Sequence, residues 1–177
     1  MNADAARDQS SIDGASLSNP VVVGVDGSAE ARRGMLFAAD LSTRLDVELV
    51  AVHARGLLER IASGAGSGRS EAVEALETNC LAVLSEIDGL RWSWKVEDGA
   101  PIDVLLRVAD EVDAGFVVVG SHGAGHSDEP LLGSTSHWVV RNSHRPVIVV
   151  PPGDNHPHHR RPFGAGGSLM GGGVADH

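Results

Sequence analysis

Strand-like and helix-like segments alternate along this chain from residue 20 to residue 152. Strand-like runs such as VVVGV at 21–25 and FVVV at 116–119 are apolar at consecutive positions, which is typical of strands covered on both faces. The longer segments between them repeat apolar residues at helical spacing. Strands that alternate with helices form parallel sheets with right-handed crossovers. The sequence therefore predicts an α/β fold with a doubly wound parallel sheet, of Rossmann-like type.

Five strands and about four helices are expected. The strands are predicted at 20–26, 47–54, 91–97, 114–120 and 145–151, and the helices at 28–45, 71–87, 100–113 and 134–143. Ser28 has the side chain and the position of an N-cap for the first helix. We expect the strand order 3-2-1-4-5, with the last strand at an edge beside the fourth. In such sheets, ligands bind beyond the carboxyl ends of the strands, where the winding direction reverses.

The two ends of the chain differ in composition from this central domain at 20–152. Residues 1–19 are small and polar without a period, which predicts a disordered arm. Residues 153–177 contain seven of the 22 glycines and predict a flexible tail. The tail motif NHPHHRRP could bind a metal or an anionic partner, but a solvated low-complexity tail is the commoner meaning of such a sequence.

Charge and composition argue against several classes of protein. The chain has 14 Lys and Arg against 24 Asp and Glu, a formal net charge of −10, which disfavours nucleic acid and anionic membranes as partners. No apolar run approaches the roughly 20 residues that cross a bilayer. The first residues lack the apolar segment of a signal peptide. Cys80 is the single cysteine and cannot form an intramolecular disulfide. We therefore expect a cytoplasmic protein.

The segment after the fourth strand, GSHGAGHSDEPLLGSTS at 120–136, combines glycines with the start of a helix. Gly120, Gly123 and Gly133 allow positive φ and close approach of a ligand to the backbone. Ser134 opens the last helix, whose first N–H groups attract an anion. The segment is predicted to hold phosphate. An ordinary glycine-bearing loop is the alternative.

The loop after the first strand, which begins at Asp26, is expected to face the glycine segment if the first and fourth strands are neighbours. Other motifs fit less well. SGAGSGRS at 63–70 has serine and arginine where a Walker A loop needs glycine and lysine. No G-x-S-x-G motif is present, so a serine hydrolase is unsupported. His122, His126 and Asp128 could form a metal site, but two exposed histidines and a loop acid are the commoner case. No catalytic residue is assigned.

The spacing G-x2-G-x9-G-[ST] after the fourth strand, in a chain whose first strand reads VVVGVDGS, resembles the universal stress protein family in its ATP-binding branch. GAPIDVLLRVADEVDAGFVVVGSHG is similar to that family's third helix and fourth strand, and RPVIVVPP to its closing strand. The resemblance covers about residues 20–152. It implies ATP or another adenine nucleotide at the point where the winding reverses.

Specific residues follow from this resemblance. The motif that holds the phosphates and ribose in the family is matched by Gly120, Gly123, Gly133, Ser134 and Thr135. Asp26 matches the aspartate that lies beside the nucleotide. Ala54 occupies the position of a small apolar residue that lines the adenine pocket.

The segment HSDEP at 126–130 departs from the glycine and apolar residues usual in the family. A carboxylate about 6 Å from a phosphate charge costs roughly 3 kcal/mol at an effective dielectric constant near 20. We therefore expect Asp128 and Glu129 to point into water. The alternative is a Mg²⁺ ion that bridges Asp128, or Asp26, to the phosphates.

The last strand is also expected to form a dimer contact. Val147 to Val150 are uncharged and lack the devices that protect an edge strand, apart from Pro146 before them. A twofold partner that presents the same strand would close both edges, and the family resemblance implies the same homodimer. The function expected is a nucleotide-binding stress or signalling protein without efficient catalysis. A slow ATPase and a nucleotide-free dimeric interaction module are the alternatives.

Overall fold

The structure is a computed structural model, and it describes residues 18–56, 71–122 and 132–152. The predicted arm (apart from its last two residues), the predicted tail and SGAGSGRS lie outside these ranges. So do Gly123, His126, Asp128 and Glu129, and the expectations placed on them remain predictions.

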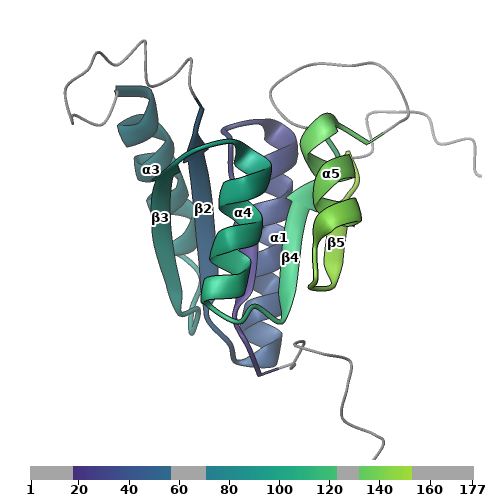
Figure 1. The fold of residues 1–177 in the computed structure, drawn as a ribbon. Helices are drawn as coiled ribbons and strands as arrows, with labels where there is room; N and C mark the ends of the chain where they lie inside the picture. The colour runs from purple at the N-terminus through teal and green to yellow at the C-terminus, as the bar shows by residue number, and fades with distance from the viewer. Residues whose placement is uncertain (1–17, 57–70, 123–131, 153–177) are drawn as a thin grey trace, which may run out of the picture.

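The described residues form four helices and one sheet of five parallel strands, and the strand order is β3-β2-β1-β4-β5 (Figure 1). The predicted fold class and strand order are both confirmed. The strands are β1 (Val21–Gly24), β2 (Leu49–Arg55), β3 (Trp92–Asp98), β4 (Phe116–Gly120) and β5 (Val147–Val150). The helices are α1 (Ala29–Leu45), α3 (Glu71–Leu84), α4 (Pro101–Glu111) and α5 (Ser134–Asn142).

Helices cover both faces of the sheet, as the consecutive apolar positions predicted. Alternate residues of β1 enter opposite cores. Val21 and Val23 pack with α1 and α3, whereas Val22 packs with α4 and α5. All three valines are fully buried. The even division of the strand residues between two cores explains why their sequence is apolar without alternation.

β1 and β5 differ most from their predicted lengths, and both are shorter. β1 ends at Gly24 rather than at residue 26, although the N–H of Val25 still donates to the carbonyl of Val52 at 2.8 Å. β5 begins at Val147 rather than at residue 145, because Pro146 has no N–H to donate to the ladder. Its carbonyl nevertheless accepts from the N–H of Val117 at 2.9 Å. The start of β5 is therefore set by a residue that cannot donate, whereas the hydrogen bonds of β1 continue one residue past its assigned end.

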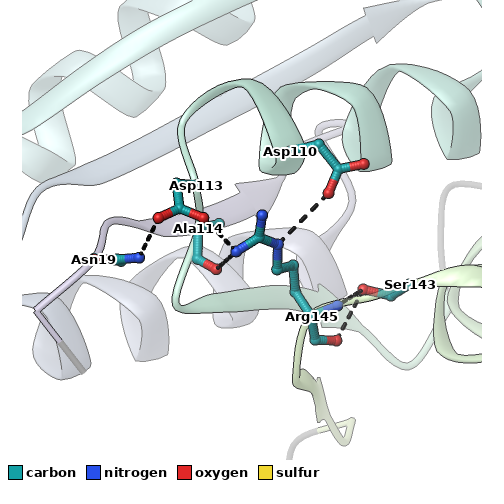
Figure 2. Close-up of polar contacts among 6 residues, drawn as sticks. All are labelled: Asn19, Asp110, Asp113, Ala114, Ser143 and Arg145. Carbon is teal, nitrogen blue, oxygen red and sulfur yellow. Dashed lines mark hydrogen bonds and ion pairs between the residues drawn. The ribbon is translucent and has the colours of Figure 1, made fainter. Parts of the chain in front are cut away.

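At the amino ends of the strands, Arg145 ties three distant segments together (Figure 2). Its guanidinium donates to Asp113 at 2.6 Å and to the carbonyl of Ala114 at 3.4 Å, and it lies 3.5 Å from a carboxylate oxygen of Asp110. Asn19 donates to the other oxygen of Asp113 at 2.8 Å. The chain before β1, the turn between α4 and β4, and the start of β5 are thus held by one cation whose side chain is only 13% exposed.

Among the described residues, no helix has both the length and the apolar character needed to cross a membrane.

Candidate functional site

A cleft opens at the carboxyl ends of β1, β2 and β4, where the winding of the sheet reverses between β1 and β4. It contains ≈ 590 Å³ of empty space, including solvent at its mouth. The residues around it are Gly24, Val25, Asp26, Ala31, Val52, His53, Ala54, Pro101, Leu105, Val119, Gly120, His122, Thr135 and Ser136.

Several residues that the sequence singled out surround this cleft. Asp26, Ala54, Gly120 and Thr135 line it. Gly133 and Ser134 lie at the start of α5, directly before Thr135. The structure therefore brings the loop after β1 and the two described ends of the glycine segment to one crevice, as the strand order requires.

Gly120 has a packing role that the sequence did not indicate. Its φ is not in the positive range, and a Cβ at this position would lie 2.7 Å from the carbonyl carbon and 2.8 Å from the carbonyl oxygen of Glu30 in α1. Gly34, one turn further along α1, lies against the backbone of Gly120 as well. Gly120 therefore does not use the freedom of positive φ, and the structure needs a glycine here for the close approach of α1 to β4.

Two of the helix starts beside the cleft, those of α1 and α5, are capped differently. In α1, the hydroxyl of Ser28 accepts from the N–H of Ala31 at 3.0 Å, as predicted for an N-cap. Asp26 in turn accepts from the hydroxyl of Ser28 at 2.6 Å and from its N–H at 3.0 Å. In α5 the N-cap is Gly133, which has no side chain to offer. The first N–H groups of α5 are therefore left to other acceptors.

Gly133 does not use positive φ either. Its φ is −58°, which any residue can adopt. Its N–H donates to the carbonyl of Ser121 at 2.7 Å, and the N–H of Ser121 donates to Val150 of β5 at 2.8 Å. The buried hydroxyl of Ser136 donates to the carbonyl of Gly120 at 2.5 Å. These bonds hold the end of β4 and the start of α5 together at the cleft.

The cleft is divided by polarity. The side formed by β2 and α4 is mostly apolar, with Val52, Ala54, Pro101 and Leu105 beside the buried His53. The side formed by the end of β4 and the start of α5 carries backbone groups, the hydroxyls of Thr135 and Ser136, and the imidazole of His122. A flat apolar group fits the first side, and an anion fits the second.

Two histidines of the cleft were not assigned to the nucleotide site from the sequence. His53, which is buried, donates from Nδ1 to the carbonyl of Val25 at 2.8 Å, and its ring lies parallel to Trp94 with 6.4 Å between the ring centres. His122 directly follows the Gly120-Ser121 pair in the glycine segment. The position of His122 beside the second motif glycine could have indicated a role in the nucleotide site, but from the sequence this residue was considered only as a possible metal ligand. Pro101, Leu105 and Ser136 were missed because their contact with the cleft depends on how α4 and α5 pack.

The fold and the position of this cleft define an α/β protein with a crevice at its winding reversal. Residues 18–151 match the universal stress protein family, and the chain belongs to that family. It is 34% identical over 138 residues to universal stress protein Rv2005c of Mycobacterium tuberculosis, an alignment that covers 74% of this chain. The chain spans 45% of the length of that relative.

Solved structures agree with this assignment of fold. Protein MJ0577 superposes with a TM-score of 0.65 at 21% identity, over 77% of this chain and 98% of the other. A universal stress protein solved in complex with cAMP superposes with a TM-score of 0.58 at 26% identity, over 75% of this chain and 95% of the other. The predicted family is thus confirmed.

Proposed function

We propose that this universal stress protein binds an adenine nucleotide, with ATP as the first candidate, in the cleft at the ends of β1, β2 and β4. The observation that carries the proposal is the division of the cleft by polarity. The base would lie on the apolar side at Ala54 and Leu105, and the phosphates would lie at the start of α5, where Gly133 leaves the first N–H groups to other acceptors. The relative of known structure that holds cAMP supports this choice of ligand class.

We propose a binding and signalling role rather than efficient hydrolysis. Asp26 is the single carboxylate among the described lining residues, and its Oδ1 already accepts two hydrogen bonds from Ser28. Efficient phosphoryl transfer also uses a cation such as an arginine finger, and neither lysine nor arginine is among the described lining residues. A slow ATPase remains the alternative, and metal-dependent turnover of ATP above a trace rate would favour it.

A Mg²⁺ ion would enter the site with the nucleotide. Within the described ranges, no three His, Cys, Asp or Glu residues come together to hold a metal. Asp26 supplies the oxygen donor that Mg²⁺ prefers, and the remaining ligands would be phosphate oxygens and water. We therefore expect magnesium to change ATP affinity and to have no measurable affinity for the protein alone.

Gly133→Val tests the nucleotide site. The φ of −58° suits valine, so the variant is expected to fold, while its side chain takes up space beside the first N–H groups of α5. Binding of ATP and AMP by calorimetry should fall below detection, with an unchanged circular dichroism spectrum. Ala100→Val is the matched control, because Ala100 is the exposed N-cap of α4 with a similar extended backbone and does not line the cleft. Wild-type affinity in Gly133→Val would contradict the proposed site.

We also propose a homodimer through β5. All four of its residues, Val147 to Val150, are only half-buried at this edge of the sheet. The carbonyls of Pro146 and Val150 accept from β4. Because backbone groups alternate in direction along a parallel strand, those of Val147 and Val149 face the free edge. A second copy of β5 would pair with these outward groups.

Val149→Pro tests this interface. Proline removes an outward-facing N–H and leaves the bonds between β4 and β5 in place, so we expect a folded monomer by analytical ultracentrifugation. Val149→Thr keeps the N–H and should remain dimeric, whereas Ile148→Pro removes an inward N–H and should misfold. A wild-type chain that sediments as a monomer at tens of micromolar would refute the dimer. The cytoplasmic location stays a prediction.

A further inference from the structure

His122 has an imidazole nitrogen that the fold itself does not use. The residue follows β4 directly and lines the cleft on the side of α5. Its Nδ1 lies 3.3 Å from the hydroxyl of Ser121. Its Nε2 is buried, and no partner for it exists among the described residues. A buried polar nitrogen without a hydrogen bond is costly, which makes it a strong indicator of an absent partner.

The cleft offers few other sources of positive charge. Neither lysine nor arginine is among the described residues that line it. His53, the other histidine there, already donates from Nδ1 to Val25 and is held against Trp94. On the side of β4 and α5, the described residues would therefore offer a bound phosphate backbone N–H groups, hydroxyls and the imidazole of His122.

We propose that Nε2 of His122 donates a hydrogen bond to a phosphate of the bound nucleotide, and that its protonation strengthens the binding. This inference rests on the proposed function, since it names the side chain that holds the ligand's anionic part. Histidine changes charge between about pH 5 and pH 8. Nucleotide affinity should therefore contain a component that increases as the pH falls through this interval.

Other charged groups near the cleft can also change nucleotide affinity as the pH changes. The loop after β1 contributes Asp26, and β2 contributes His53. From α1, Glu30 and Arg33 pair with each other at 2.9 Å. The residues of α4 at the cleft, Pro101 and Leu105, are uncharged, and on α5 the nearest titratable side chain, His137, is exposed. The phosphate titrates as well. A variant of His122 alone leaves all of these unchanged, so a comparison of pH profiles isolates its contribution.

The experiment measures AMP affinity by calorimetry at pH 6 and pH 8 for the wild type, His122→Ala, His122→Gln and His137→Ala. We expect His122→Ala to bind AMP about tenfold more weakly than the wild type at pH 6. Glutamine places an uncharged amide donor near the position of Nε2, so His122→Gln should recover part of this loss. It should also lose the wild type's additional gain in affinity between pH 8 and pH 6, which we expect to be about threefold to tenfold. His137→Ala should match the wild type.

The outcomes separate the two proposals. Equal AMP affinity of His122→Ala and the wild type at both pH values would overturn the inference and leave the proposed function intact. So would a pH 6 to pH 8 ratio in His122→Gln that equals the wild-type ratio. A wild-type protein that binds neither AMP nor ATP at either pH would overturn the proposed function and the inference together. If His122→Ala fails to fold, the His122→Gln ratio alone decides.

Discussion

The polar groups described here at the two ends of the sheet differ in whether they have partners within the described residues. At the amino end, Arg145 is paired with Asp113, Asp110 and the carbonyl of Ala114 (Figure 2). At the carboxyl end, the Nε2 of His122 has no described partner, and α5 begins at a glycine without a capping side chain. We propose that this difference leaves the carboxyl end able to bind a ligand. Ser42 Oγ and Trp94 Nε1 are also buried without a described partner, so it is the location of His122 in the cleft, and not the unmet nitrogen alone, that supports a ligand there.

Gly120 is an exception to this comparison, because it lies at the carboxyl end of the sheet but serves the packing of the fold. The largest effect we expect comes from Gly120→Ala, whose Cβ would lie within 2.8 Å of the Glu30 carbonyl group of α1. Since α1 would have to shift, the free energy of unfolding should fall by about 2–3 kcal/mol. Urea titration measures this change.

Gly34→Ala is the matched control on the facing helix. Its Cβ would lie 3.4 Å from the backbone nitrogen of Gly120, an ordinary contact. Alanine also favours the helix, so this variant should range from unchanged to about 1 kcal/mol more stable. If both variants lose the same stability, the close approach is not the reason for Gly120. If Gly120→Ala keeps full stability and loses only nucleotide, Gly120 belongs to the site instead.

Arg145→Ala tests the amino end and should have an intermediate effect. Its two carboxylate partners are more than half exposed, so each ion pair contributes little, and the packed side-chain stem adds to the loss. We expect the free energy of unfolding to decrease by about 1–2 kcal/mol, measured by urea titration. AMP affinity of the folded protein should not change. A loss of affinity in a fully folded variant would show that the two ends are coupled.

The strands and their order could be predicted because local sequence determines them. Consecutive apolar residues such as Val21, Val22 and Val23 indicate a strand that is buried on both faces of the sheet. The alternation of strands with helices then leaves few possible sheet topologies. The position of the cleft follows from that order, which is why Asp26 and Ala54 were found from the sequence and the resemblance.

The rest depends on contacts between segments that are distant in sequence. Arg145 meets Asn19 and Asp113 only after the sheet has assembled, and no local pattern indicates such a network. The packing role of Gly120 was missed for the same reason, since the carbonyl that a Cβ would meet belongs to another element. His122 could be read as a loop histidine until the structure placed its Nε2 in a buried position.

The smallest effect concerns a second hollow, which lies on the other face between α1 and α3 and is lined by Arg32, Leu76, Asn79 and Cys80 among others. Burial raises the pKa of the Cys80 thiol to about 11, and Arg32 offsets this only slightly. A thiol in an unfolded chain ionises near pH 8.5. Between that pH and 11 the unfolded state loses a proton that the native state keeps, so stability falls as the pH rises.

We therefore expect the wild type to lose on the order of 1 kcal/mol of unfolding free energy between pH 7.5 and 9.5 that Cys80→Ala does not lose. Iodoacetamide should label the native thiol slowly at pH 7.5, because the reactive thiolate is scarce. Both results would identify this hollow as an incompletely filled part of the core. It would then differ from the cleft, where we propose that polar groups bind a ligand. Rapid labelling of the native protein would instead show that the Cys80 thiol is accessible and reactive. The hollow would then be a second candidate site, on the other face of the sheet from the cleft.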